Sequence, residues 1–104
     1  MTETVVLKLG GSVITDKSGD CVIDHARLHK IAEELARERA TALVLVHGAG
    51  SCGHPEARRY RINDGLTGEN VPGVYHTHAA VSRLNAAVVE ALRDAGVEAI
   101  GIHP

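Results

Sequence analysis

Two short aliphatic runs, each ending directly in a glycine-rich loop, constrain this chain more than any other feature. Residues 4–9 (TVVLKL) stop at Gly10-Gly11, and residues 42–46 (ALVLV) break into a loop over residues 47–54 (HGAGSCGH). Short runs of β-branched and aliphatic residues bounded by glycine are typical of buried strands. We therefore expect two strands whose carboxyl ends each lead into a loop with an accessible backbone.

Helical patterns alternate with these runs. From Asp24, a predicted N-cap, apolar residues recur in the i, i+3, i+4, i+7, i+8 stripe of an amphipathic helix that should end near Ala40. A second helix is expected from about Val74 to Ala95, with Gly96 as its C-terminal stop, and residues 97–102 predict a third strand. Residues 58–73 are polar and glycine-containing, and we expect a mobile loop there. The order predicts an α/β fold with parallel strands and right-handed crossovers.

Composition narrows the class of protein. A chain of 104 residues supplies one modest core, and without Phe or Trp that core must be aliphatic. The 11 Lys and Arg are scattered among 13 acids, so no nucleic acid partner is expected. Neither a signal-like start nor an apolar run approaching 18 residues is present, so we expect a soluble cytoplasmic protein with no membrane partner. Cys21 and Cys52 lack metal-ligand spacing and are expected to be reduced thiols.

The glycine loops predict phosphate as the ligand. Ligands of open α/β sheets collect beyond the carboxyl ends of the strands, where glycines let backbone N–H groups approach an oxyanion. Lys8 near the first strand end and Lys17 beyond the first loop could neutralise a transferring phosphoryl group. His54, at the far end of the second loop, could donate to a substrate phosphate. The alternatives are an edge-strand cation for Lys8, a solvated loop residue for Lys17 and a surface histidine beside Pro55 for His54.

Other readings of these motifs fit less well. No stretch supplies the G-x-x-x-x-G-K-[ST] of a P-loop. Residues 48–53 match the dinucleotide pattern G-x-G-x-x-G after a strand, but Pro55 follows closely and no acid stands at a strand end about 20 residues on. His76 and His78 would point apart at the start of a helix, so no metal ligand is predicted.

Residues 8–17 (KLGGSVITDK) and 47–54 (HGAGSCGH) together resemble the two opening motifs of the isopentenyl phosphate kinases, within the amino acid kinase superfamily. A strand-borne Lys before Gly-Gly and a His-Gly-x-Gly recur across that superfamily, whereas Ser-x-Gly-His is narrower. A histidine at His54 is similar to that of isopentenyl phosphate and fosfomycin kinases. The resemblance implies a three-layer α/β/α fold with a mainly parallel sheet. Residues 1–104 would be its N-terminal, acceptor-phosphate-binding part, with the C-terminal nucleotide-binding part absent.

The resemblance also implies an activity. It is ATP-dependent phosphorylation of isopentenyl phosphate to isopentenyl diphosphate, in the alternative mevalonate route of isoprenoid biosynthesis, with ATP and Mg²⁺ as cofactors. The 104 residues alone would be inactive, and the full-length protein would be a homodimer. Two alternatives stay open: a kinase of fosfomycin or another small acceptor, and a non-catalytic phosphate-binding domain that needs a partner.

The site residues implied by the resemblance fall into three groups. The catalytic residues are Lys8, Lys17 and His54; the ATP-binding residues are Lys8, Leu9, Gly10, Gly11, Ser12 and Gly50; the acceptor-binding residues are Gly48, Ala49, Gly53 and His54. Ala49 departs from the usual glycine, which is tolerable only with a negative φ, and Cys52 departs from a common phenylalanine.

Overall fold

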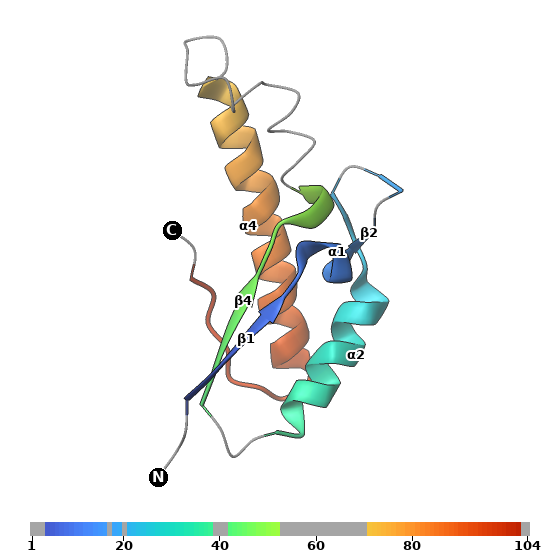
Figure 1. Ribbon diagram of the computed structural model, residues 1–104, viewed down its shortest axis with the longest axis vertical. Coiled ribbons are helices and arrows are strands. Elements are labelled where there is room, and N and C mark those ends of the chain that lie inside the picture. Colours follow the sequence, from blue (N-terminus) through green and yellow to red (C-terminus); the bar gives the residue numbers. More distant parts are fainter. Residues whose placement is uncertain (1–3, 17, 20, 39–41, 53–70, 103–104) are drawn as a thin grey trace.

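The computed structural model describes residues 4–16, 18–19, 21–38, 42–52 and 71–102 (Figure 1). Helices and a pair of long strands dominate this part of the chain. In order, the elements are β1 (Thr4–Leu9), a short helix α1 (Gly11–Ile14), β2 (Thr15–Asp16), β3 (Val22–Ile23), α2 (His25–Ala36), β4 (Ala42–His47), the 3₁₀ turn η1 (Gly50–Cys52) and α4 (Val71–Asp94).

The two long strands β1 and β4 pair in parallel, in register from Thr4 opposite Ala42 to Leu9 opposite His47. Since α2 connects them, the pair forms a β–α–β crossover of the kind the sequence predicted. The α/β fold with a parallel sheet is therefore confirmed. A second, two-stranded sheet, the antiparallel hairpin of β2 and β3, was not predicted, because each of its strands has only two residues.

Helix α2 begins as predicted and ends early. The Asp24 carboxylate accepts a hydrogen bond from the Arg27 N–H at 3.1 Å, which satisfies one of the free donors of the first turn. Leu28, Ala32 and Ala36 form its buried stripe. The helix ends at Ala36 and not near Ala40, because the apolar periodicity stops there and leaves further turns without a buried face.

Helix α4 begins at Val71, before the predicted Val74, so residues 71–73 belong to a helix and not to the predicted loop. The rest of that predicted loop lies outside the described residues. Gly96 stops the helix as expected: its φ is 90°, its N–H donates to the Arg93 carbonyl, and the Val97 N–H donates to the Leu92 carbonyl at 2.9 Å. These bonds are those of a Schellman motif.

The predicted third strand over residues 97–102 is wrong. These residues form no ladder with any described strand and instead run back along α4, where the Arg93 side chain donates to the Ala99 carbonyl at 3.0 Å. Ile100 and Ile102 are about four-fifths exposed, at 80% and 81%. An aliphatic run becomes a strand only where another strand is free to pair with it, and no described strand does so here.

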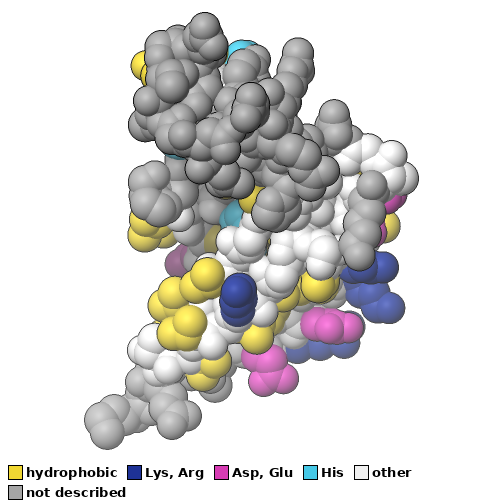
Figure 2. Space-filling view, turned by 45° about the horizontal axis from the view of Figure 1, so that its top comes forward, with side chains coloured by type: hydrophobic (Ala, Val, Ile, Leu, Met, Phe, Trp, Pro, Cys, Tyr) yellow, Lys and Arg dark blue, Asp and Glu magenta, His cyan; other side chains and the backbone are white. Residues whose placement is uncertain are grey.

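The core lies on one face of the β1–β4 pair, where α2 and α4 pack against each other (Figure 1). Its buried residues come mainly from α2 and α4, and α1 and η1 add Ile14 and Cys52. On the opposite face Val6, Val44 and Val46 are 67%, 48% and 44% exposed, and Figure 2 shows hydrophobic side chains gathered on the strand pair. In the described part of the chain, helices therefore cover one side of the sheet, and the expected third layer is not seen.

Across the described residues, no helix is both long and apolar enough to cross a bilayer.

Candidate active site

The two glycine loops meet at the carboxyl edge of the sheet. The Gly48 N–H donates to the Leu9 carbonyl at 3.1 Å, which carries the strand pairing into the loops. Beyond this bond the backbones touch: a Cβ placed on Gly11 would overlap the Gly50 nitrogen and lie 2.9 Å from the Ala49 carbonyl carbon. The first glycine loop (residues 10–12, here called the donor loop) and the second (residues 48–50, here called the acceptor loop) thus form one continuous backbone surface. The acceptor loop carries Gly48 and Ala49 of the predicted acceptor site and also Gly50, which is predicted to bind ATP.

The backbone of the second loop explains where a side chain is allowed. Gly50 has a φ of 53°, a conformation that non-glycine residues rarely adopt. Ala49 is not among the described non-glycine residues with positive φ, so the negative φ that an alanine requires at this position is met. The methyl group of Ala49 is accommodated because the positive φ occurs at the next residue, Gly50.

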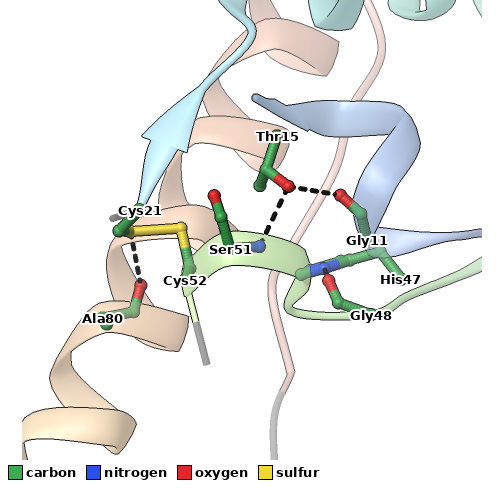
Figure 3. Close-up of a disulfide and its surroundings, with 8 residues drawn as sticks. All are labelled: Gly11, Thr15, Cys21, His47, Gly48, Ser51, Cys52 and Ala80. Carbon is green, nitrogen blue, oxygen red and sulfur yellow. Dashed lines mark hydrogen bonds between the residues drawn. A yellow bond between two sulfur atoms is a disulfide. The ribbon is translucent and has the colours of Figure 1, made fainter. Parts of the chain in front are cut away.

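Thr15 ties the two loops together from below. Its hydroxyl donates to the Gly11 carbonyl at 2.7 Å and accepts from the Ser51 N–H at 3.1 Å, and the residue is 4% exposed (Figure 3). Sequence reasoning missed this residue. The available signal was a hydroxyl residue four positions after a glycine at the start of a short helix, which is too common a pattern to single it out.

His47 holds the peptide that follows β4. Its Nδ1 lies 2.9 Å from the Gly48 carbonyl, which can only accept, so Nδ1 carries the proton and Nε2 accepts from the Asn85 amide at 3.0 Å. Because C=O and N–H point in opposite directions across a trans peptide, fixing the Gly48 carbonyl also fixes the direction of the Ala49 N–H. Asn85, on α4, was a second residue missed, because nothing in the sequence connects it to a loop 38 positions away.

The predicted cationic and histidine residues are only partly described. Lys8 lies on the open face of the sheet, exposed, on the same side of the strand as Val6 and beside Val46. Lys17, Gly53 and His54 lie outside the described residues. The structure thus brings together Leu9, Gly11, Gly48, Ala49 and Gly50 of the predicted site. The binding and catalytic roles of all the predicted site residues remain predictions.

Cys21 and Cys52 form a disulfide, so the prediction of two reduced thiols is wrong (Figure 3). The β2–β3 hairpin turns the chain back over η1, where the Cys21 N–H donates to the Ser51 carbonyl at 2.9 Å. Cys21 also has a φ of 52°, uncommon for a residue with a side chain. The unpredicted hairpin hid this contact between residues 31 positions apart.

Removal of this disulfide is expected to lower the free energy of unfolding by about 3–4 kcal/mol, as chain-entropy estimates give for a loop of this length. The measurement is thermal unfolding of the full-length protein with and without a thiol reductant, beside non-reducing peptide mapping for the Cys21–Cys52 link. The control is the double variant Cys21→Ala/Cys52→Ala, in which reductant should change nothing at this link. Equal unfolding temperatures in both conditions for the unaltered protein would contradict the assignment.

Near the first loop, one carboxylate has a shifted acidity. The backbone N–H of Ser18, with help from its side chain, lowers the pKa of Asp16 below its ordinary value, and Arg27 adds a small effect in the same direction. Because the pKa of Asp16 is lower in the folded than in the unfolded state, its carboxylate stabilises the fold at pH values above the pKa of the unfolded state. This stabilisation is lost as the pH falls through the pKa of the folded state. Asp16 is exposed, and its carboxylate accepts a hydrogen bond from the Ser18 N–H at 2.9 Å in the turn that follows β2. Among described residues no group of three His, Cys, Asp or Glu side chains is placed to hold a metal ion.

With this geometry in place, comparison with known proteins gives the family. The model of the amino acid kinase family matches residues 3–104, and the chain belongs to that family. Among curated proteins, it is 41% identical over 106 residues to an isopentenyl phosphate kinase of Methanothermobacter thermautotrophicus, with 96% of this chain and 40% of that protein covered. It is 42% identical over 101 residues to the isopentenyl phosphate kinase of Haloferax volcanii, with 96% and 41% covered.

Solved structures give the same picture. One isopentenyl phosphate kinase structure matches with a TM-score of 0.86 at 39% identity, over 94% of this chain and 43% of the other. A substrate complex of isopentenyl phosphate kinase matches with a TM-score of 0.83 at 31% identity, over 96% of this chain and 41% of the other. The chain spans about two-fifths of the length of the curated relatives it matches.

Proposed function

We propose that this chain is the acceptor-side part of an ATP-dependent kinase that converts isopentenyl phosphate to isopentenyl diphosphate, a step of isoprenoid biosynthesis. The observation that carries the proposal is the backbone contact of the two glycine loops at the end of the parallel strands, where phosphate is expected to bind. Relatives named isopentenyl phosphate kinase support the choice of acceptor.

In this proposal the two loops divide the work. The backbone of residues 10–12 and of Gly50 faces the phosphates of ATP, and the Ala49 N–H, directed by His47, faces the acceptor phosphate. Gly48, Gly53 and His54 complete the acceptor side, and Leu9 ends the strand that presents the first loop.

Phosphoryl transfer requires the protein to align the two substrates and to neutralise negative charge. The acceptor is already an anionic phosphate oxygen, so no general base is needed, and catalysis rests on alignment and neutralisation. Lys8 and Lys17 would supply the neutralisation, one before and one after the first glycine loop. ATP, when bound, would supply the phosphoryl group, and Mg²⁺ would neutralise part of the negative charge on its phosphates. The fit of the chain to such a ligand rests on the paired glycine loops, since a side chain at position 11 would force the two loops apart.

We also propose that further chain completes the protein. The open face bearing Val6, Val44 and Val46 is apolar, whereas parallel sheets are normally buried on both sides. A C-terminal nucleotide-binding part of the length that the relatives have would cover it, and the 104 residues alone would then be inactive.

At full length we propose a homodimer in the cytoplasm, where ATP is available. The Cys21–Cys52 bond would then be one of the uncommon intracellular disulfides.

The test is a coupled ADP-release assay with isopentenyl phosphate, comparing the 104-residue chain with the protein extended to its natural stop codon. Turnover in the longer protein alone supports both the acceptor and the missing part. Turnover by the short chain would contradict the proposed division of the protein. If the longer protein phosphorylated only fosfomycin or another small acceptor, the proposed substrate would be wrong and the family reading would stand.

His54 offers a prediction outside the described residues. In the full-length protein, His54→Ala should raise the KM for isopentenyl phosphate and lower kcat by roughly tenfold or more, because a charge-assisted hydrogen bond to the acceptor phosphate is lost. Steady-state kinetics with each substrate varied in turn will separate this from an effect on ATP. The matched control is His29→Ala, at an exposed position of α2, which should leave KM and kcat unchanged. Unaltered kinetics in His54→Ala would remove the role assigned to it.

A further inference from the structure

Thr15 is the one buried polar residue in the core of the described part of the chain, with 4% of its surface exposed. A buried hydroxyl is costly unless it is hydrogen-bonded. Here it has two partners in two different loops, 36 positions apart in one case. The residue therefore connects segments that the strand ladder alone does not hold together.

The direction of each bond is fixed by chemistry. A backbone N–H can only donate, so the Thr15 Oγ1 accepts from Ser51 at 3.1 Å, and its own proton must go to the Gly11 carbonyl at 2.7 Å. The Gly11 carbonyl also accepts from the Thr15 N–H, which closes the short helix α1. Both functions of the hydroxyl are thus used inside the protein, and its burial keeps it from a ligand.

These bonds orient peptides that face the site. Because a trans peptide is planar, a Gly11 carbonyl held inward places the Ser12 N–H on the opposite side. The Ser51 N–H held by Thr15 likewise sets the Gly50–Ser51 peptide, at the residue whose φ of 53° allows the loops to touch. One side chain thereby sets the relative position of the loop proposed for ATP and the loop proposed for the acceptor.

We propose that Thr15 is a positioning residue that fixes the donor and acceptor loops at the separation needed for phosphoryl transfer; this inference rests on the proposed function. It touches neither phosphate and acts through Gly11 and Ser51. Its effect is therefore on the alignment of two bound phosphates, more than on the affinity for either one. A displacement of about 1 Å between reacting groups is enough to cost roughly a hundredfold in rate.

The experiment uses the full-length protein and three variants. Thr15→Val keeps the β-branched shape and removes the hydroxyl, and kcat should fall by about tenfold to a hundredfold with KM values changed much less. Thr15→Ser keeps the hydroxyl and should restore most of kcat. Val88→Ala, in the core of α4, lowers the unfolding temperature without touching the loops and should leave kcat unchanged where the protein is folded.

A second measurement needs no substrate. Hydrogen exchange of the Ser51 amide, followed by NMR, should be about tenfold faster in Thr15→Val than in the unaltered protein or in Thr15→Ser. An unaltered protein with no kinase activity would overturn the proposed function, and Ser51 exchange would still decide whether Thr15 holds the loops. Unchanged exchange in Thr15→Val would overturn the link between the loops. Faster exchange with an unchanged kcat would overturn the positioning role.

Discussion

Replacing Gly11 with alanine is expected to separate the two glycine loops and to lower kcat of the full-length enzyme by about a hundredfold or more. The added methyl group would overlap the Gly50 nitrogen and crowd the Ala49 carbonyl carbon, and both are backbone atoms that cannot rotate away. Overpacking of this kind typically costs about 1–3 kcal/mol of stability as well. Steady-state kinetics together with thermal unfolding will measure both effects.

Gly10→Ala is the matched control, one residue earlier in the same loop. Among the described residues, a methyl group there would meet only the Val13 side chain, at an ordinary 3.8 Å, and the φ of −61° suits alanine. We expect stability close to that of the unaltered protein. If Gly11→Ala were as stable as Gly10→Ala and as active as the unaltered protein, the backbone contact between the loops would not exist in solution.

The parts of the fold that could be predicted are those written in local periodicity. The residues of β1, the N-cap Asp24 and the glycine that ends α4 all follow from patterns within a few positions. The glycine loops could be placed at one edge for the same reason, since parallel strands put their carboxyl ends side by side. The family motifs then added a chemistry to that edge.

The parts that could not be predicted depend on pairing between distant segments. The β2–β3 hairpin has too few residues for a period to show, and the Cys21–Cys52 bond depends on that hairpin. Thr15 and Asn85 act through contacts 36 and 38 positions away, so no local pattern marks them. For residues 97–102 the error is the reverse: the local aliphatic pattern predicts a strand, but no described strand pairs with it.

Lys8 lies on the exposed, apolar face of the β1–β4 sheet, and its replacement is expected to have the second large effect on kcat. Lys8 lies there on the same side of β1 as Val6, two residues before Gly10, on an otherwise apolar surface. Cover from further chain would remove this surface from water. In a site from which water is excluded, the positive charge of a lysine stabilises a phosphoryl group more strongly than it does in solvent, because the local dielectric constant is lower.

Lys8→Met in the full-length protein is therefore expected to lower kcat by about a hundredfold to a thousandfold, the range found when one stabilising charge or donor of a transition state is removed. Methionine keeps an unbranched apolar stem on the sheet, so the unfolding temperature should change little. Lys30→Met, on the exposed side of α2, removes the same charge far from the loops and should leave kcat unchanged.

The form of the kinetic change decides what Lys8 does. An interaction made mainly in the transition state lowers kcat and kcat/KM together, whereas one made equally in the ground state raises KM alone. Rate measurements at saturating ATP and acceptor, with each then varied separately, distinguish the two. A rise in KM for ATP at constant kcat would make Lys8 a nucleotide-binding residue only. The stabilisation of the phosphoryl group in transfer would then have to come from Lys17 or from the proposed C-terminal part.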